Sequence, residues 1–382
     1  MTNAVIIDGV RTPVGRRGGA LAGWHPTDLL AQTLQTLVDR TGIDSALLDD
    51  VIVGCALTRG EQGSNFARYG VLAAGLPESL PATTIDRQCG SGQQAVHFAA
   101  QAVRSGDYRF AIAAGVDSMS RVPLGELFDP SLGPGPWYGQ RSQMRYHGGL
   151  GAQGPAAEAV IQKWGLTREE LDDFSAESHR RADAATEAGF FADHLVGIDG
   201  LTRDEGIRSD IDRAKMWTLR TVFADDGAIT AANSSQISDG AAALLIADED
   251  GARTAGLRPK AAIRAMTVAA DDPVLQFTAV LPAARSALDR AGLSIEDIDR
   301  VEVNEAFACV PVLFAKEFRI GFDRLNVNGG SIAIGHPLGS TGARMMTDLV
   351  YELHRSGSRY GMLTICEGGG MANCTIIERI DG

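Results

Sequence analysis

The sequence predicts an α/β fold made of two copies of one supersecondary unit, with a further segment inserted into it. Short β-prone apolar runs such as 51–56 and 110–115 alternate with longer amphipathic stretches such as 93–105. This alternation is typical of sheets covered by helices. The second observation is an internal repeat, and the third is composition, because 45 glycines and few aromatic residues suit close helix–sheet packing.

The repeat appears in two places. Residues 39–56 (DRTGIDSALLDDVIVGCA) match residues 289–306 (DRAGLSIEDIDRVEVNEA) at an offset of 250. Both read as a helix end, a glycine stop, a short acidic turn and a V-x-V strand. Residues 104–109 match 355–360 at an offset of 251, and each precedes an apolar run. Because two matches occur in order at nearly one offset, we expect two copies of one unit.

The repeat also predicts the domain organisation. We expect an N-terminal half over residues 1–120, completed by a strand within 239–260. A C-terminal half occupies residues 261–382. Residues 121–238 are then an inserted loop domain.

One helix within the insertion has clear end signals. Thr167 and Glu170 have the spacing of a capping box, and Gly189 stands where a helix should stop. The sequence therefore predicts a helix between them.

The formal net charge of −13 argues against a general nucleic-acid binder. An anionic substrate would need a locally basic patch. Residues 130–157 contain no Asp or Glu but include Arg141, Arg145 and His147. This stretch is either such a patch or a solvated loop.

Several protein classes are excluded by what the chain lacks. No window approaches eighteen uninterrupted apolar residues, and the N-terminus has no basic region followed by an apolar run. We therefore expect a cytoplasmic protein with no membrane partner. The five cysteines are odd in number and scattered, which makes a disulfide framework improbable. With no C-x-x-C or H-x-x-x-H cluster, we also expect no metal site.

Cys89 lies in the segment TTIDRQCGSGQQA, residues 83–95, where a β-prone run meets a glycine turn and then a helix. A sulfur at a helix N-terminus faces free backbone N–H groups and the positive end of the helix dipole, which favour the thiolate and lower its pKa. A buried structural cysteine at a tight turn is the alternative. The flanking glycines make the two interpretations about equal, because a reactive group needs access.

His336 lies in a second unusual segment, NVNGGSIAIGHPLGSTG, residues 326–342. Its position between Gly335 and Pro337, in a loop opening a helix, suits a general base. The loop lacks both G-K-[ST] and G-x-G-x-x-G with a distal acid, so it does not fit a phosphate cradle of either kind.

Two strand ends supply the remaining groups. Cys366 follows the apolar run MLTI and precedes consecutive glycines, whose backbone N–H groups can approach an oxyanion without obstruction. Asn304 leaves the strand VEV, at the edge where α/β proteins place ligands.

Together these segments resemble the thiolase family. The family motifs are C-x-S-G, N-E-A-F-A, G-G-x-x-x-x-G-H-P-x-G-x-[ST]-G and C-x-G-G-G, and all four occur here in family order. A fifth motif matches at 227–235 (GAITAANSS), and the N-terminal V-R-T-P-V-G matches too. The resemblance covers essentially the whole chain. It implies a five-layered αβαβα body with an inserted loop domain.

The resemblance implies the role of each group. Cys89 takes the acyl group as a thioester after His336 removes its proton. Cys366 exchanges a proton with the α-carbon of the second acyl-CoA or with the incoming CoA thiol. Asn304, through a water, and His336 form one oxyanion hole, and the backbone N–H groups of Cys89 and Gly368 form the other.

The resemblance also implies how coenzyme A binds. It implies no permanent cofactor, with CoA and acyl-CoA as substrates in lipid metabolism such as β-oxidation, and a homodimer or homotetramer. Five positions match CoA-contacting or pocket positions of the family: Arg208, Phe223, Ala231, Ser235 and Phe307.

Several positions depart from the family pattern, among them Met371 and Ala372, where Gln and Gly are common. Ala152 and Gln153 stand where His and Met are frequent, and Glu367 stands where an apolar residue is common. We therefore expect a differently shaped or more polar acyl site, and a substrate bulkier than acetoacetyl-CoA.

Two alternatives share the fold. A ketoacyl synthase-like condensing enzyme typically has histidine in place of the N-E-A-F asparagine and lacks the C-x-G-G-G cysteine. A non-catalytic acyl-CoA or sterol carrier has H-D-C-F instead of N-E-A-F. This chain has Asn304 and Cys366, which favours a thiolase.

Overall fold

The computed structural model describes residues 3–125, 139–147 and 149–381. Its strands are β1 (Ala4–Arg11), β2 (Gly15–Arg16), β3 (Asp50–Gly54), β4 (Ala82–Ile85), β5 (Phe110–Ser118), β6 (Ser238–Asp248), β7 (Ala261–Ala270), β8 (Arg300–Val303), β9 (Tyr360–Glu367) and β10 (Met371–Arg379). Its α-helices are α1 (Pro26–Thr41), α2 (Phe66–Ala73), α3 (Ser91–Ser105), α4 (Gln140–Arg145), α5 (Gln153–Trp164), α6 (Arg168–Glu187), α7 (Arg213–Thr218), α8 (Glu249–Thr254), α9 (Val280–Ala291), α10 (Cys309–Phe318) and α11 (Leu338–Ser356).

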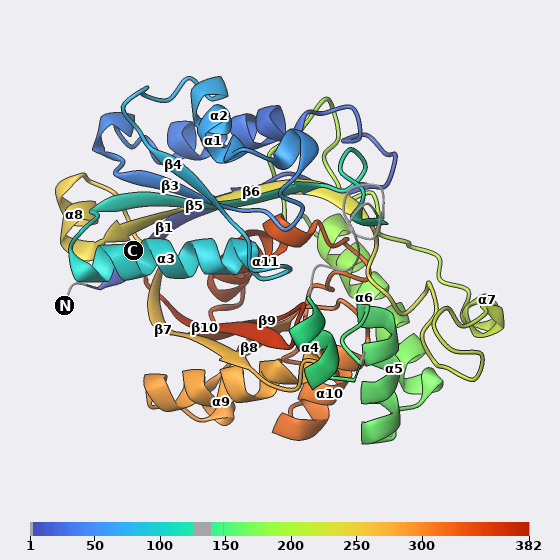
Figure 1. Ribbon diagram of the computed structural model, residues 1–382. Helices are drawn as coiled ribbons and strands as arrows, with labels where there is room; N and C mark the ends of the chain where they lie inside the picture. Colours follow the sequence, from blue (N-terminus) through green and yellow to red (C-terminus); the bar gives the residue numbers. More distant parts are fainter. Residues whose placement is uncertain (1–2, 126–138, 148, 382) are drawn as a thin grey trace.

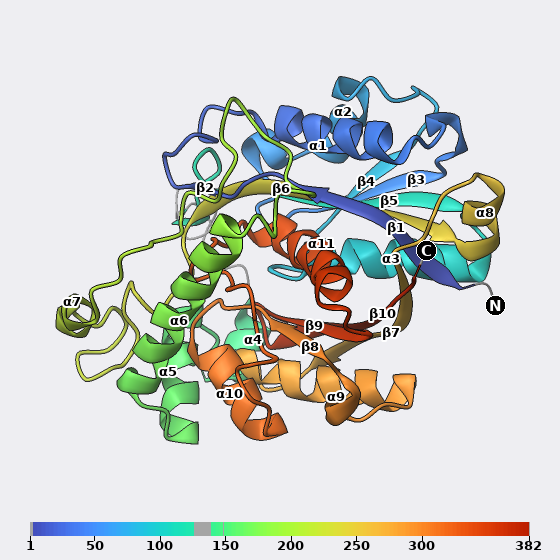
Figure 2. The same cartoon turned by 180° about the vertical axis from the view of Figure 1, so that it is seen from behind.

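The strands form one hydrogen-bonded path, β4-β3-β5-β6-β1-β7-β10-β9-β8, with β2 paired to β6 beside it. The path folds into two stacked layers: a first sheet, β4-β3-β5-β6-β1, and a second sheet, β7-β10-β9-β8. The two are joined where residues 5–6 of β1 pair with 261–262 of β7. Figure 1 shows α1 and α2 above the first sheet, α3 and α11 between the sheets, and α9 and α10 below the second. The expected five-layer α/β fold is confirmed, and Figure 2 shows the same layers from behind.

The two sheets repeat one topology. In each, a parallel pair (β3 with β5, β8 with β9) continues into antiparallel strands (β6 then β1, β10 then β7). Side chains repeat with it: Asp49 accepts hydrogen bonds from the backbone N–H groups of residues 109–110 at 2.6 and 3.0 Å. Asp299, 250 positions later, accepts from those of 359–360 at 2.8 and 2.9 Å. This equivalence confirms the predicted duplication.

Helices α3 and α11 cross tightly between the sheets because both begin with small residues. A Cβ on Gly342 would lie 2.2 Å from the backbone nitrogen of Gln93, and one on Gly92 would lie 2.6 Å from the carbonyl oxygen of Gly339. Only glycine permits this approach. The crossing brings the N-terminal ends of the two helices together.

The segment between β5 and β6 carries α4 to α7 and packs beside the sheets (Figures 1 and 2). The predicted capping box is confirmed: Thr167 and Glu170 bond each other's backbone at the start of α6, and Gly189 has φ 75° just after its end. Buried Arg11 of β1 ties this segment to α11 through Asp204 at 2.8 Å and Asp348 at 2.7 Å.

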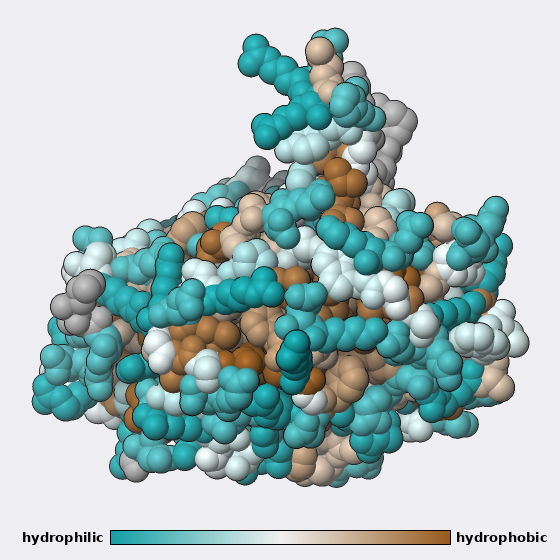
Figure 3. Space-filling view, turned by 90° about the horizontal axis from the view of Figure 1, so that it is seen from below, coloured by the Kyte–Doolittle hydropathy of each residue, from teal (hydrophilic) through white to brown (hydrophobic). Residues whose placement is uncertain are grey.

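The surface is largely hydrophilic with scattered hydrophobic patches, as Figure 3 shows for the face below the second sheet. Within the described ranges, no helix is long and apolar enough to cross a membrane.

Candidate active site

Cys89 lies on a strained turn between β4 and α3. Gln88 before it has φ 51°, a left-handed conformation that non-glycine residues rarely adopt. Asp86 holds this turn by accepting from the Gln88 backbone N–H at 2.7 Å, and the Ser91 hydroxyl donates to the Gln88 carbonyl at 2.6 Å. The turn sets Cys89 directly before Gly90, the N-cap of α3, with its side chain buried.

His336 lies in the equivalent place before α11. Gly335 has φ 116°, and a Cβ there would meet the Ser238 hydroxyl at 2.5 Å, so only glycine fits. The ring is held through Nδ1, which lies 2.7 Å from the Thr341 hydroxyl. Because that hydroxyl donates to the Pro337 carbonyl at 2.9 Å, it accepts from Nδ1–H, and the lone pair is on Nε2.

Asn304 follows β8 and reaches the imidazole directly. Its Nδ2 lies 3.3 Å from His336 Nε2, and its Oδ1 accepts from the Ser331 hydroxyl at 2.6 Å. Its backbone N–H donates to the Thr364 carbonyl, which anchors Asn304 beside the end of β9. Two groups singled out from separate sequence motifs therefore meet.

Cys366 lies near the end of β9, and Gly368 follows in the turn to β10. A Cβ on Gly368 would lie 3.2 Å from the side-chain oxygen of Gln88, so this turn borders the residue before Cys89. Burial raises the pKa of the Cys366 thiol, and the nearby Cys89 raises it further. All four motifs therefore converge where α3 and α11 begin.

The expected lowering of the pKa of Cys89 is wrong for the free protein. Burial and, to a smaller extent, the nearby Glu367 carboxylate raise the pKa of this thiol to about 12, against a lowering contribution from Gln153. Burial also lowers the pKa of His336 to about 3, with a smaller effect from Arg344. In each case desolvation disfavours the charged form. The resting pair is therefore a neutral thiol and a neutral imidazole.

Gln153 is a contact that the sequence analysis placed in the acyl pocket without a role. It begins α5, and its side chain lies beside the Cys89 thiol, whose pKa it lowers against the larger effect of burial. The signal was the departure from the family pattern at this position.

The expected CoA-contacting residues fall into two groups. Phe223 packs edge-on against Phe307 with ring centroids 6.1 Å apart, and the Ser235 backbone N–H donates to the Ala306 carbonyl next to Phe307. Ala231 is exposed on the same loop. Arg208 is exposed and bonds through its backbone to His179 of α6, and no described contact joins it to the others.

The acid-free stretch is only partly described. Arg141 and Arg145 lie exposed on α4, whereas residues 130–138 and 148 lie outside the described residues.

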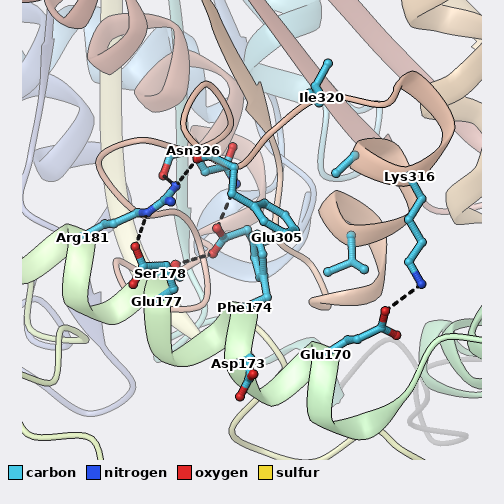
Figure 4. Close-up of a pocket in the computed structure, with 13 residues that line it drawn as sticks. Glu170, Asp173, Phe174, Glu177, Ser178, Arg181, Glu305, Lys316, Ile320 and Asn326 are labelled. Atoms are coloured by element: carbon cyan, nitrogen blue, oxygen red, sulfur yellow. Dashed lines mark hydrogen bonds and ion pairs between the residues drawn. The ribbon is translucent and has the colours of Figure 1, made fainter.

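A separate cavity of about 420 Å³ lies between α6 and α10 (Figure 4). Glu305, which follows Asn304, is among its lining residues and is held there by Ser178 and Asn326. Cys89, His336 and Cys366 do not line it, so this cavity is distinct from the converging motifs.

In residues 3–125, 139–147 and 149–381, no group of three His, Cys, Asp or Glu side chains is arranged to hold a metal ion.

Comparisons with known proteins give a consistent result. Models of the thiolase N-terminal and C-terminal domains match residues 4–250 and 257–379. The chain is 47% identical to a steroid 3-ketoacyl-CoA thiolase of Mycobacterium tuberculosis, covering 100% of this chain and 95% of that protein. It is 40% identical to a beta-ketoadipyl-CoA thiolase of Escherichia coli, with 100% of both covered. The crystal structure of Bacillus anthracis acetyl-CoA acetyltransferase superposes with a TM-score of 0.91 at 36% identity, covering 100% and 99% of the chains.

Proposed function

Because the chain belongs to the thiolase family, we propose that it cleaves a 3-ketoacyl-CoA with CoA, or runs the reverse condensation, through an acyl group carried on Cys89. It is an acyltransferase of acyl-CoA. One observation supports the assignment of residues: His336 contacts Asn304, and this pair lies where α3 and α11 cross. Cys89 precedes α3 at the same crossing.

In the first half-reaction, the Cys89 thiol gives its proton to Nε2 of His336, and the sulfur attacks the 3-keto carbon. The bond between C2 and C3 then breaks, and the departing acyl-CoA enolate takes a proton from Cys366. Cys89 is left as a thioester. Covalent capture divides one difficult step into two easier ones.

In the second half-reaction, the incoming CoA thiol gives its proton to the Cys366 thiolate, and its sulfur attacks the thioester. The Cys89 sulfur leaves and recovers its proton from His336. Protons and charges balance over the cycle, so the resting neutral pair is restored.

Negative oxygen develops in both half-reactions, and fixed donors are expected to stabilise it. We assign Asn304, acting through a water, and His336 to the CoA thioester carbonyl, and the backbone N–H groups of Cys89 and Gly368 to the acyl-enzyme. The N-terminal ends of α3 and α11 add favourable dipoles at this place.

A ketoacyl synthase-like enzyme or a non-catalytic carrier is less well supported. Both alternatives predict loss of Asn304 or Cys366, and here both residues are present at the convergence of the motifs. The family models also cover almost the whole chain.

For the acyl group, we propose a ring-bearing or branched 3-ketoacyl unit. The support is Ala152 and Gln153 at the start of α5, together with the similarity to a relative named for a steroid substrate. The test is kcat/KM for acetoacetyl-CoA against that for a cyclic 3-ketoacyl-CoA. A clear preference for acetoacetyl-CoA contradicts this part.

The remaining assignments are also proposals. Residues 121–238 form an inserted loop domain for CoA binding, beside the halves 1–120 (completed by a strand within 239–260) and 261–382. The residues that contact CoA are Arg208, Phe223, Ala231, Ser235 and Phe307. The protein acts in the cytoplasm as a homodimer or homotetramer. Light scattering of the purified chain measures the oligomeric state, and a monomer contradicts it.

The function is tested by comparing C89A with C374A. Cys374 is equally buried, lies in β10 and has no assigned role, so it is the matched control. We expect C89A to lose all measurable thiolysis and C374A to keep most of it. Turnover by C89A overturns the proposed function.

A further inference from the structure

Glu367 is a buried carboxylic acid beside the nucleophile. It ends β9 directly after Cys366, and its side chain packs on Gly90, the residue after Cys89: a Cβ on Gly90 would lie 1.9 Å from Glu367 Oε1. The side chain is fully buried. The catalytic steps above do not use it.

The hydrogen bonding of this carboxyl is incomplete. One orientation of the Asn373 side-chain amide gives both its oxygen and its nitrogen a hydrogen-bond partner. In that orientation, the amide nitrogen donates to Glu367 Oε1 at 3.0 Å. Oε2 has no hydrogen-bond partner within the described part of the chain. An ionised carboxylate with a bare buried oxygen is costly, whereas a neutral carboxyl is tolerated.

The charges around Glu367 act in both directions. Burial raises its pKa to about 8, Arg87 opposes this shift, and Asp86 adds to it. Cys89 lies on the same turn as Asp86 and Arg87, and Cys366 precedes Glu367 in β9. From β10 it meets the uncharged side chain of Asn373, which in turn contacts Gln94 of α3. Arg87 is the cation that opposes the raised pKa of Glu367, and its Nε has no hydrogen-bond partner among the described residues.

Glu367 and Cys89 are both buried, so ionising both at once costs free energy because their negative charges repel each other. An ionised Glu367 raises the pKa of Cys89 and, to a smaller extent, that of Cys366. When Glu367 is neutral, its charge no longer raises the pKa of Cys89. Its protonation state is therefore linked to how easily the nucleophile forms its thiolate.

We propose that Glu367 is a positioning residue that acts through Cys89 as an ionisable switch: its neutral carboxyl, seated on Gly90, permits formation of the Cys89 thiolate, and its ionised form suppresses it. This role rests on the proposed function of Cys89. It makes acyl transfer decline in mildly alkaline solution, where a rising thiolate fraction alone would increase it.

The switch is tested by following alkylation of Cys89 by iodoacetamide in wild type, E367Q and E367V. Below the pKa of Glu367, at about pH 6, all three should react at rates within about twofold of one another. At about pH 9, E367Q and E367V should react about tenfold faster than wild type, because about one unit of pKa separates their thiols. The valine variant restores the apolar class common in the family, so at least one variant should fold.

The same variants are then assayed for thiolysis across this pH range. In wild type, kcat/KM should fall above about pH 8, and in both variants that fall should disappear. The matched control is E302Q, since Glu302 is also buried with a raised pKa but faces Asp348 and Arg344. It should keep the wild-type profile.

Three outcomes overturn the switch: parallel profiles for wild type and E367Q, a uniform loss at every pH, or an equal change in E302Q. Failure of the proposed function gives a different result. In that case C89A continues to turn over substrate, whatever the alkylation rates show.

Discussion

Replacing Thr341 by valine removes one hydroxyl from beside His336 and tests how the imidazole is held. The Thr341 hydroxyl accepts from Nδ1–H at 2.7 Å while donating to the Pro337 carbonyl at 2.9 Å. This arrangement keeps the proton on Nδ1 and leaves Nε2, beside Asn304 Nδ2, without a proton, so that it can accept the thiol proton. Valine has the same shape but cannot accept a hydrogen bond.

The magnitude follows from the burial of the ring. His336 is only 3% exposed, so water does not replace the lost acceptor. A buried donor without a partner costs about 1–3 kcal/mol, which the ring can relieve by moving its proton to Nε2. Either way the productive tautomer becomes rarer by about 5- to 150-fold, and kcat/KM should fall by that factor.

The assay is steady-state thiolysis, with thermal unfolding measured on the same samples. T341S restores the hydroxyl and should remain within about threefold of wild type. If folded T341V keeps kcat/KM within about twofold of wild type, Thr341 does not set the tautomer and the reasoning is refuted.

Three further predictions concern stability. G342A should lower the free energy of unfolding by about 3 kcal/mol, because the new Cβ would lie 2.2 Å from a backbone nitrogen of α3. The control G23A places its Cβ in open space and should change that free energy by less than about 0.5 kcal/mol. Equal effects of the two variants in denaturant titrations would contradict the tight crossing. D204N should lower the free energy of unfolding by about 3 kcal/mol, because it removes one of the carboxylates that pair with the buried Arg11 guanidinium. An unchanged free energy of unfolding in the same titrations would show that this ion pair is dispensable. For Glu367, whose pKa is raised from 4.5 to about 8, the stability it contributes is complete below pH 4.5 and lost as pH rises through about 8. Wild type should therefore lose a few kcal/mol relative to E367Q over that window, and parallel pH–stability curves contradict the raised pKa.

Much of the fold could be predicted from local signals. The repeat around Asp49 and Asp299, the capping box at Thr167 and the glycine turns are short-range patterns, and each implies one backbone geometry. They recur in the structure because a turn is fixed by its own few residues.

The contacts within the site could not be predicted in the same way. Thr341 holding His336, Gln153 reaching Cys89 and Glu367 seated on Gly90 each depend on how separate elements pack. The pKa of Cys89 also depends on packing. Its position at a helix end, which the sequence shows, favours a lowered pKa, whereas burial, which depends on the whole fold, raises the pKa and is the larger effect.

The central claim is that the acyl group is carried on Cys89, and mass spectrometry of the acyl-enzyme tests it most directly. The protein is mixed with a 3-ketoacyl-CoA without free CoA, quenched in acid and digested. We predict that the peptide containing Cys89 gains the mass of the acyl group, that added CoA removes it, and that C89A shows no gain. Acylation of Cys366 or Cys309 instead, or full turnover with no acylated cysteine, would contradict the account.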